Sequence, residues 1–379
     1  MKAKSKAVSV VLFLSVFILV ISSGEQEVER KKNIKHENEV RVIKNSKEFS
    51  IQRLKLLSKF GGMNVAENQI FNNPVDIAVC KKGRIYILDS KDNNIKIFRE
   101  DGSFIKYFSR EGSGPGEFKR PWILDILEEE IYVADTGNRR IQVFTKDGQY
   151  LRSFKAPVDF GQGMRFDSKG NIYLNTKGFR SPKIISVYNS KGHFIREIGD
   201  LEGKSFEFFD FTLIKKQIRN GEIPDSFKND LLLIVDNNGY IFAVHRALNK
   251  FKKYSSKGEL FAEVEIKTEE YNKIYKSFLE KNESEKNPSI FWPLYYVNDL
   301  AVDEKGNLYI LLNDPSRMTI YVYSNDGKFK VKLIGVGDRI FRIAISSNEY
   351  LYALSQETHF IYKFKLDFDK LGKKQALHR

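Results

Sequence analysis

A strand–turn–strand unit recurs six times along this 379-residue chain, and this repetition constrains the fold more than any other feature. The clearest copy is the stretch 131–144, in which Ile131, Val133, Ile141 and Val143 alternate with other residues on either side of an Asp-Thr-Gly-Asn segment. Period-two alternation is typical of half-buried strands, and Asp, Gly and Asn are the residues of tight turns. The unit is therefore predicted to be a β-hairpin.

The six copies are spaced as the blades of a propeller would be. Each copy carries one aromatic residue at the same place in its pattern: Tyr86, Tyr132, Tyr173, Phe242, Tyr309 and Tyr352. The successive spacings are 46, 41, 69, 67 and 43 residues. Four short strands need roughly 40–50 residues, so three intervals fit one blade each and two contain an insertion. We predict an all-β fold, a six-bladed β-propeller of four-stranded blades.

The sixth copy ends after its third strand, and the other end of the chain contains a candidate for the missing strand. Residues 49–60 alternate like a strand and run into Gly61 and, later, Phe71 and Pro74, an order that also follows the fourth strand of the first copy. Closing the ring in this way would protect the sheet edges. The N-terminal strand is therefore predicted to complete blade six.

The hairpin at 131–144 closely resembles an NHL repeat, whose pattern is a strand, Asp, a Gly-Asn turn, Arg, and a second strand that ends in Phe. Here these positions are Asp135, Gly137, Asn138, Arg140 and Phe144. The resemblance extends over about 48–366 and implies an NHL-type six-bladed propeller. It also implies that the arginine of the pattern ties the hairpin to the scaffold. The residue before it, Arg139, is at a variable position and is the better candidate for ligand contact.

The N-terminus has the order of a secretory signal peptide, because three lysines precede an apolar run at 7–21 that ends in Ser-Ser-Gly. This run is shorter than the ~20 residues of a spanning helix, although a retained membrane tether through 7–21 remains an alternative. We predict the following segments: 1–24 signal peptide or short anchor, 25–47 flexible charged tether, 48–366 propeller, and 367–379 basic tail. An exported protein would be periplasmic, extracellular or anchored at the cell envelope. Export argues against a nucleic-acid partner in spite of the net charge of +14.

The two insertions, at about 199–229 and 267–293, flank blade four and have helical patterns. In the second, apolar residues between Tyr271 and Leu279 recur at i, i+3, i+4, i+7 and i+8, and Thr268 is positioned to cap the helix. Both insertions join the fourth strand of one blade to the first strand of the next. In a propeller these connections emerge on the face that carries the hairpins between second and third strands. The insertions are therefore expected to form a lid or a binding wall beside the channel mouth.

Candidate catalytic residues on this face are few. Amidating lyases with NHL-like propellers use a zinc ion held by histidines from several blades, but only His245 and His359 are expected here. Lactonase-like propellers hold a divalent ion at the channel, where the aligned first strands of this chain are expected to place Asp76, Ile123, Gly163, Leu232, Asp299 and Arg342. The charged residues among them are Asp76, Asp299 and Arg342. These three residues could bind an ion, but an Asp–Arg ion pair between blades five and six is favoured. A metal-dependent lyase or hydrolase with a divalent cation is therefore the alternative function.

Basic and aromatic residues are more frequent on this face than catalytic ones. They are Lys119, Arg120, Trp122, Arg139, Arg165, Arg180, Arg246, Arg317, Arg339 and Arg342. The residues predicted to contact a ligand on this open face are Arg120, Trp122, Arg139, Arg165, Arg180, His245, Arg317 and Arg342. NHL-type propellers resemble protein-, glycan- and RNA-binding modules more often than enzymes. The leading interpretation is an exported, non-catalytic binding module that needs no cofactor. Its expected ligand is extended and anionic, an acidic glycan or peptide, or another protein, because arginine binds carboxylates in a bidentate manner.

Overall fold

The computed structural model describes residues 41–44, 50–63, 65–156, 163–179, 181–208, 210–287 and 290–367. The predicted signal peptide lies outside these residues, as do all but 41–44 of the predicted tether and all but Asp367 of the predicted tail. Within the described ranges, no helix has both the length and the apolar character needed to span a bilayer. From Val42 onward the chain forms one compact unit.

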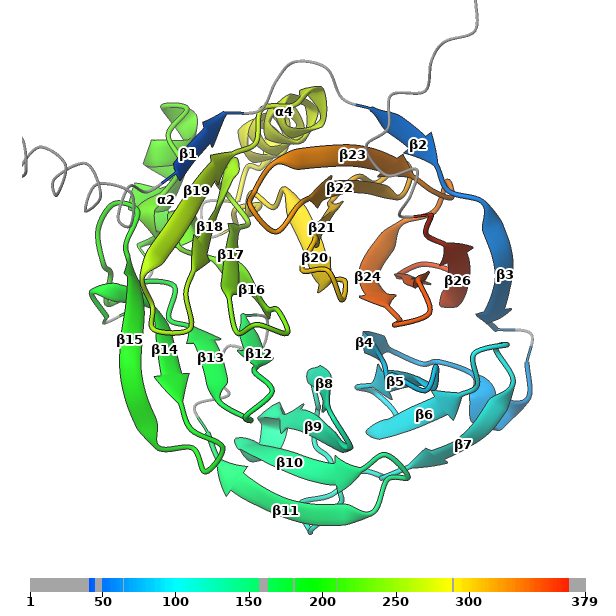
Figure 1. Cartoon of the computed structure of the whole chain (residues 1–379). Coiled ribbons are helices and arrows are strands. Elements are labelled where there is room, and N and C mark those ends of the chain that lie inside the picture. The colour runs from blue at the N-terminus through cyan, green and yellow to red at the C-terminus, as the bar shows by residue number, and fades with distance from the viewer. Residues whose placement is uncertain are drawn as a thin grey trace, which may run out of the picture. The chain divides into compact units, whose positions relative to one another are not determined.

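Six sheets surround a common centre, and each contains the four antiparallel strands of one blade (Figure 1). Two of the sheets have a fifth strand at one edge, and the fourth strand of blade six comes from the N-terminal part of the chain. Blade one consists of β4 (Pro74–Val79), β5 (Ile85–Asp89), β6 (Asn94–Phe98) and β7 (Phe104–Phe108). Blade two consists of β8 (Ile123–Leu127), β9 (Glu130–Asp135), β10 (Arg140–Thr145) and β11 (Tyr150–Lys155). Blade three consists of β12 (Met164–Phe166), β13 (Ile172–Asn175), β14 (Lys183–Tyr188) and β15 (Phe194–Asp200). Blade four consists of β16 (Leu231–Val235), β17 (Ile241–His245), β18 (Lys250–Tyr254) and β19 (Leu260–Glu265). Blade five consists of β20 (Val297–Val302), β21 (Leu308–Leu312), β22 (Thr319–Tyr323) and β23 (Phe329–Ile334). Blade six consists of β24 (Ile340–Ile345), β25 (Tyr350–Ser355), β26 (Phe360–Lys365) and β3 (Leu56–Gly61). The predicted six-bladed, four-stranded propeller is confirmed.

The core lies between neighbouring sheets, and the repeated aromatic residues explain how it is filled. All six lie in the second strand of their blade and are at most 4% exposed. The first strands contact one another in sequence around the centre, from β4 through β24 and back to β4. Because every sheet packs against two others, its inner strands are buried on both faces. The alternation that marks a half-buried strand therefore gives way to continuous apolar runs such as Ile85–Leu88.

The stretch 49–60 belongs to two blades rather than one. In the structure, β2 (Ile51–Arg53) runs parallel to β23 at the outer edge of blade five, and β3 then pairs antiparallel with β26 of blade six. The register of the second pair places Phe60 opposite Ile361. Leu54, between the two strands, donates its amide to Ile334 O at 2.8 Å and packs against the core of blades five and six. One continuous strand was expected, but the chain covers the edge of blade five before it reaches blade six.

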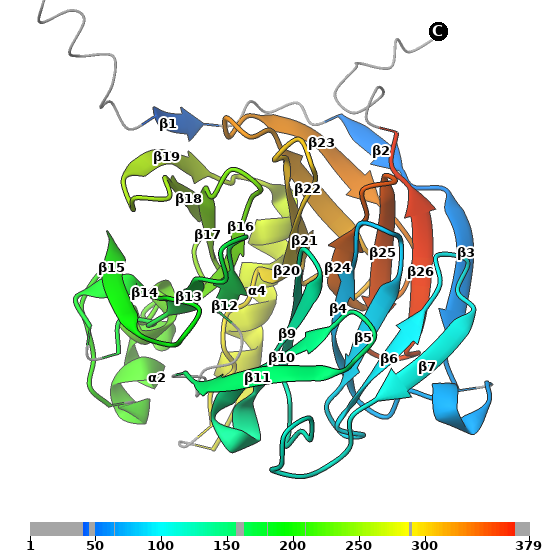
Figure 2. The ribbon, with the colours of Figure 1, turned by 60° about the horizontal axis from the view of Figure 1, so that its bottom comes forward.

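Helices lie in both predicted insertions. The first contains α2 (Phe211–Arg219) and α3 (Asp225–Lys228), and the second contains α4 (Glu269–Ser284). The predicted cap of α4 is present, since Thr268 accepts a hydrogen bond from Tyr271 N at 3.3 Å. Tyr275 on α4 donates its hydroxyl to Gly221 O at 2.9 Å. The two insertions therefore contact each other, and Figure 2 shows α2 and α4 extending toward the same side of the sheets.

Candidate functional site

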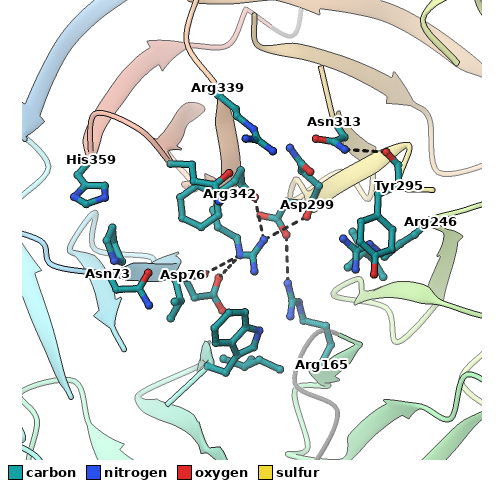
Figure 3. A pocket seen from close by; sticks show the side chains of 18 residues that line it. Asn73, Asp76, Arg165, Arg246, Tyr295, Asp299, Asn313, Arg339, Arg342 and His359 are labelled. Carbon is teal, nitrogen blue, oxygen red and sulfur yellow. Dashed lines mark hydrogen bonds and ion pairs between the residues drawn. The ribbon is translucent and has the colours of Figure 1, made fainter. Parts of the chain in front are cut away.

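A cavity of about 290 Å³ lies at the mouth of the central channel, on the side from which the insertions emerge. Its charged residues are four arginines and two aspartates: Arg165, Arg246, Arg339, Arg342, Asp76 and Asp299. Its aromatic and amide residues include Trp122, Tyr295, Phe341, His359, Asn73, Asn298, Asn313 and Gln356. Figure 3 shows that these side chains come from all around the ring and converge on the channel axis.

The first strands position the deepest residues of the cavity. Asp76, Ile123, Leu232, Asp299 and Arg342 were expected near the axis from the alignment of the repeats, and all five line the cavity. In blade three the expected residue was Gly163. The structure instead places Arg165, two residues later on β12, in the cavity.

Arg342 connects three blades at the bottom of the mouth. Its Nε donates to Val75 O of blade one at 2.9 Å and lies 3.6 Å from Asp76 Oδ1. Its Nη1 donates to Asn298 O of blade five at 3.3 Å. A guanidinium group with these partners holds neighbouring blades together, so its role is structural as well as electrostatic.

Asp299 pairs across the channel rather than with its neighbour. Its Oδ2 accepts the amide of Ile343 from blade six at 2.8 Å, and its Oδ1 lies 3.5 Å from Arg165 Nη2 of blade three. The expected Asp–Arg ion pair between blades five and six is therefore wrong. The physical reason is that one oxygen of Asp299 is occupied by the next strand, while Arg342 is held by blade one (Figure 3).

The charges at the centre of the ring are strongly coupled. Burial raises the pKa of Asp299, and the nearby guanidinium groups of Arg342 and Arg165 oppose this shift. Burial tends to lower the pKa of Arg165, but the carboxylates of Asp76, Asp299 and Asp125 outweigh it and the pKa is raised. Arg165 therefore remains a cation that is shared by three carboxylates.

Of the four arginines of the mouth, Arg339 is the one that forms no ion pair with a residue in the described ranges. Arg165 and Arg342 form ion pairs, and Arg246 lies 3.8 Å from Asp230 with its guanidinium 3.5 Å above the Tyr295 ring. The Nε of Arg339 is buried as well, and it has no hydrogen-bond partner among the described residues. A half-buried guanidinium without a partner is costly, unless an anion from outside the chain completes it.

The residues present do not fit a divalent cation. In the described ranges, no group of three or more His, Cys, Asp or Glu side chains is arranged to hold a metal ion. Asp76 and Asp299 both face arginine side chains, whose positive charge would repel a cation. His359 also lines the mouth, but its Nδ1 lies 2.8 Å from Phe71 O. Since a carbonyl oxygen can only accept, Nδ1 carries the hydrogen.

The structure brings together only part of the predicted binding set. Trp122, Arg165 and Arg342 line the mouth, and Arg317 lines a second cavity beside it. Arg120 and Arg139 are exposed and line neither cavity. The predicted Arg180 lies outside the described residues.

The expectation that His245 lies open on this face is wrong. The side chain is fully buried, and its Nδ1 lies 2.6 Å from Lys228 O, next to α3. The first insertion covers it, which the spacing of the repeats alone did not indicate.

Several residues that line the mouth were not predicted, among them Asn73, Tyr295, Asn298, Asn313, Phe341 and Gln356. They share no residue type or motif. Their common signal is position, since each lies near the start of a first strand or just after a second strand.

Solved structures share this fold at low sequence identity. A candidate exported protein from Bacteroides fragilis is 14% identical with a TM-score of 0.54, and the match covers 86% of this chain and 99% of that one. Virginiamycin B lyase from Staphylococcus aureus is 14% identical with a TM-score of 0.46, covering 83% of this chain and 100% of that one. Kuenenia stuttgartiensis hydrazine synthase is 13% identical with a TM-score of 0.48, covering 80% and 98%. At these identities the likeness extends to the fold alone.

Among curated proteins, none matches this sequence. A family model does match: residues 29–287 fit the family DUF5128, described as a 6-bladed beta-propeller. This segment is more than half of the chain and contains blades one to four, the first insertion and the α4 helix of the second. The chain therefore belongs to the DUF5128 family of 6-bladed beta-propellers.

Proposed function

We propose that this protein is an exported, non-catalytic binding module with NHL-type blades, whose basic channel mouth takes up an extended anionic ligand. The observation that carries the proposal is Arg339, a half-buried guanidinium that forms no ion pair and whose buried Nε has no hydrogen-bond partner among the described residues. It lies in a mouth where four arginines face two aspartates. An anionic group bound there would satisfy the buried donor and balance the excess positive charge.

Both carboxylates of the mouth are already engaged, which favours binding over catalysis. Asp76 accepts the amides of Ile77 and Leu124 at 3.0 and 2.9 Å and pairs with Arg342. Asp299 accepts the amide of Ile343 and pairs with Arg165. A general base must be free to take a proton from a substrate, and neither group is free.

The ligand class follows from the shape and composition of the mouth. Trp122 and Phe341 supply apolar faces, while Asn73, Asn298 and Gln356 supply polar groups around the arginines. Such a mixture suits an extended ligand with carboxylates, as in an acidic peptide or an acidic glycan. Export is supported by the signal-like N-terminus and would place the module in the periplasm, outside the cell or at the cell envelope.

The test compares Arg339→Glu with Arg120→Glu, a matched control with the same change of charge outside the cavity. The probes are pentaglutamate and an oligogalacturonate, and the dissociation constant is measured by calorimetry. We expect Arg339→Glu to weaken binding of at least one probe by about tenfold or more, equal to about 1.4 kcal/mol. The control should bind as the parent protein does.

Salt provides an independent check. Raising the ionic strength from about 0.01 M to about 0.15 M shortens the Debye length from about 30 Å to about 8 Å, so binding should weaken. An affinity that does not depend on salt, or an equal loss in both variants, would overturn the proposal.

A further inference from the structure

A second cavity, of about 630 Å³, lies between α4 and the hairpin that joins β21 to β22. Most of its wall is apolar: Ile274, Phe278, Trp292, Pro293, Leu294 and Pro315. It lies next to the channel mouth, because Tyr295, Asn313 and Arg339 line both cavities. The two cavities therefore share a wall, and Arg339 is part of that wall.

Hydrogen bonds of its backbone, rather than burial of its side chain, hold Trp292 in the wall of this cavity. Its amide donates to Asn282 Oδ1 at 2.9 Å, and its carbonyl accepts from Asn282 Nδ2 at 3.0 Å. Asn282 belongs to α4, so the helix fixes the position of the tryptophan. The indole nevertheless remains 48% exposed. A large aromatic side chain that is fixed but uncovered is typical of a binding surface.

Positive charges surround this apolar wall. Lys273, Lys281 and Arg317 line the cavity together with the acidic residues Glu270 and Asp314. Glu270 is engaged by Lys332 and by the hydroxyl of Tyr321. Asp314 accepts hydrogen bonds from the amide and hydroxyl of Ser316, and Arg317 Nε lies 3.9 Å from it. Lys273 is itself paired with Glu269 at 2.8 Å, so Lys281 and Arg339 are the basic residues of this cavity that form no ion pair in the described ranges. These two cations favour an anionic ligand, while the wall favours an apolar group.

We propose that the cavity beside α4 binds a large apolar side chain of an acidic peptide whose carboxylate is bound by Arg339. This inference rests on the proposed function and selects one of its two ligand classes. The hydroxyl groups of a glycan would lose water against Ile274, Pro293 and Leu294 without gaining partners there. Burial of a Phe or Leu side chain on the same wall would be favourable, by about tenfold or more in affinity.

The two tryptophans of the chain permit a direct test, since Trp122 lines the mouth and Trp292 lines the second cavity. Trp292→Phe leaves a fluorophore in the mouth, and Trp122→Phe leaves one beside α4. The probes are acetyl-Phe-Glu-Glu, acetyl-Ser-Glu-Glu, trigalacturonate and decanoate. We expect the Phe peptide to change the fluorescence of both variants and to bind about tenfold or more tightly than the Ser peptide. The Ser peptide and trigalacturonate should change only the Trp122 signal.

A substitution on α4 completes the experiment. Ile274→Asn should reduce the preference for the Phe peptide over the Ser peptide, whereas Lys276→Asn, on the exposed side of the helix, should leave it unchanged. Equal binding of both peptides with a response from Trp122 alone would overturn the apolar subsite and leave the anion-binding mouth intact. Tighter binding of decanoate than of the Phe peptide would overturn the assignment to a peptide. If trigalacturonate binds and neither peptide does, this inference fails and the proposed function stands. If neither the peptides nor trigalacturonate bind, the proposed function fails as well.

Discussion

The two mouths of the channel carry opposite charge. The mouth on the side of the insertions has four arginines and two aspartates, whereas a cavity of about 610 Å³ at the other end has six acidic residues against two basic ones. The acidic residues are Asp125, Glu128, Asp167, Asp236, Asp303 and Glu304. Arg165 lines both cavities and separates them.

The acidic mouth has a structural origin. Its hairpins join first to second strands, and in three of them an aspartate accepts two backbone amides of the turn. Asp303 accepts the amides of Lys305 and Asn307, both at 2.9 Å, and Asp167 and Asp236 bind equivalent amides in blades three and four. Aspartate is favoured in such turns for this reason. Turn structure therefore accounts for three of the six acidic residues, whereas no turn contact accounts for Arg339. A charged group that no contact in the fold explains is a better indication of a binding site than charge itself.

The largest effect is expected at Arg165, the residue that both mouths share. Arg165→Ala would leave Asp76, Asp125 and Asp299 without their common cation, and removing one partner of a buried pair costs about 3–5 kcal/mol. Urea unfolding measures this loss. Adding Asp299→Asn should restore part of the stability. A loss below about 1 kcal/mol would mean that the two mouths are electrostatically independent.

A smaller effect is expected from the turn aspartates, and it should differ between blades. Asp303 also binds Asn307 Nδ2 at 2.6 Å and the Tyr309 hydroxyl at 3.2 Å, whereas Asp236 Oδ2 has no hydrogen-bond partner among the described residues. Asp303→Ala should therefore cost roughly 3 kcal/mol and Asp236→Ala roughly 1 kcal/mol less.

The measurement is thermal or urea unfolding of the two variants side by side. Glu304→Ala, next to Asp303 and exposed, is the control and should stay within about 0.5 kcal/mol of the parent. Losses within about 0.5 kcal/mol at both aspartates would contradict the structural origin of the acidic mouth. Equal, larger losses would mean that the additional contacts of Asp303 do not contribute.

The pH dependence of stability tests the region behind the basic mouth. Burial lowers the pKa of His245 to about 4, which the hydrogen bond to Lys228 O only partly offsets. The unfolded chain, with an ordinary pKa of about 6.5, takes up this proton first as the pH falls. The contribution of neutral His245 to the free energy of unfolding is thus fully present above about pH 6.5 and is lost as the pH falls toward 4. The free energy of unfolding should fall by about 2 kcal/mol between pH 7 and pH 5.

Urea midpoints at the two pH values give the measurement, with His245→Gln as the variant and His193→Gln, an exposed histidine, as the control. The His245 variant should lose most of this pH dependence and the control should keep it. Equal slopes in all three proteins would show that His245 does not titrate in this way.

The smallest effect on stability is expected at Arg339. This prediction tests most directly how the basic mouth differs from the acidic one. Arg339→Ala removes a cation without a hydrogen-bond partner at Nε among the described residues, so the free energy of unfolding should change by no more than about 0.5 kcal/mol. Melting curves of the variant and the parent protein measure it. A loss of several kcal/mol would mean that Arg339 holds the fold together, as Arg342 does, and would remove it from the candidate site.

The repeating architecture of this protein can be predicted from its amino-acid sequence alone. Hairpin alternation, turn residues and the spacing of the aromatic residues predicted six four-stranded blades, because they reflect contacts within one blade or with the next. The cap and the apolar stripe of α4 are also local, and Thr268 and Phe278 have the environments that the pattern predicted. Local preferences of this kind are repeated six times and can be read without knowledge of the ring.

Which side chains meet at the channel depends on the tertiary structure and could not be predicted from the sequence. Asp299 and Arg165 are 134 residues apart in the sequence and come from blades five and three, yet lie 3.5 Å apart across the axis. A shift of two residues on β12 selects Arg165 instead of Gly163, and α3 covers His245, which repeat spacing had placed in the open. Such pairings depend on the radius of the ring, the direction of each side chain and the path of the insertions. No local pattern records these quantities, because they arise from the packing of all six blades together.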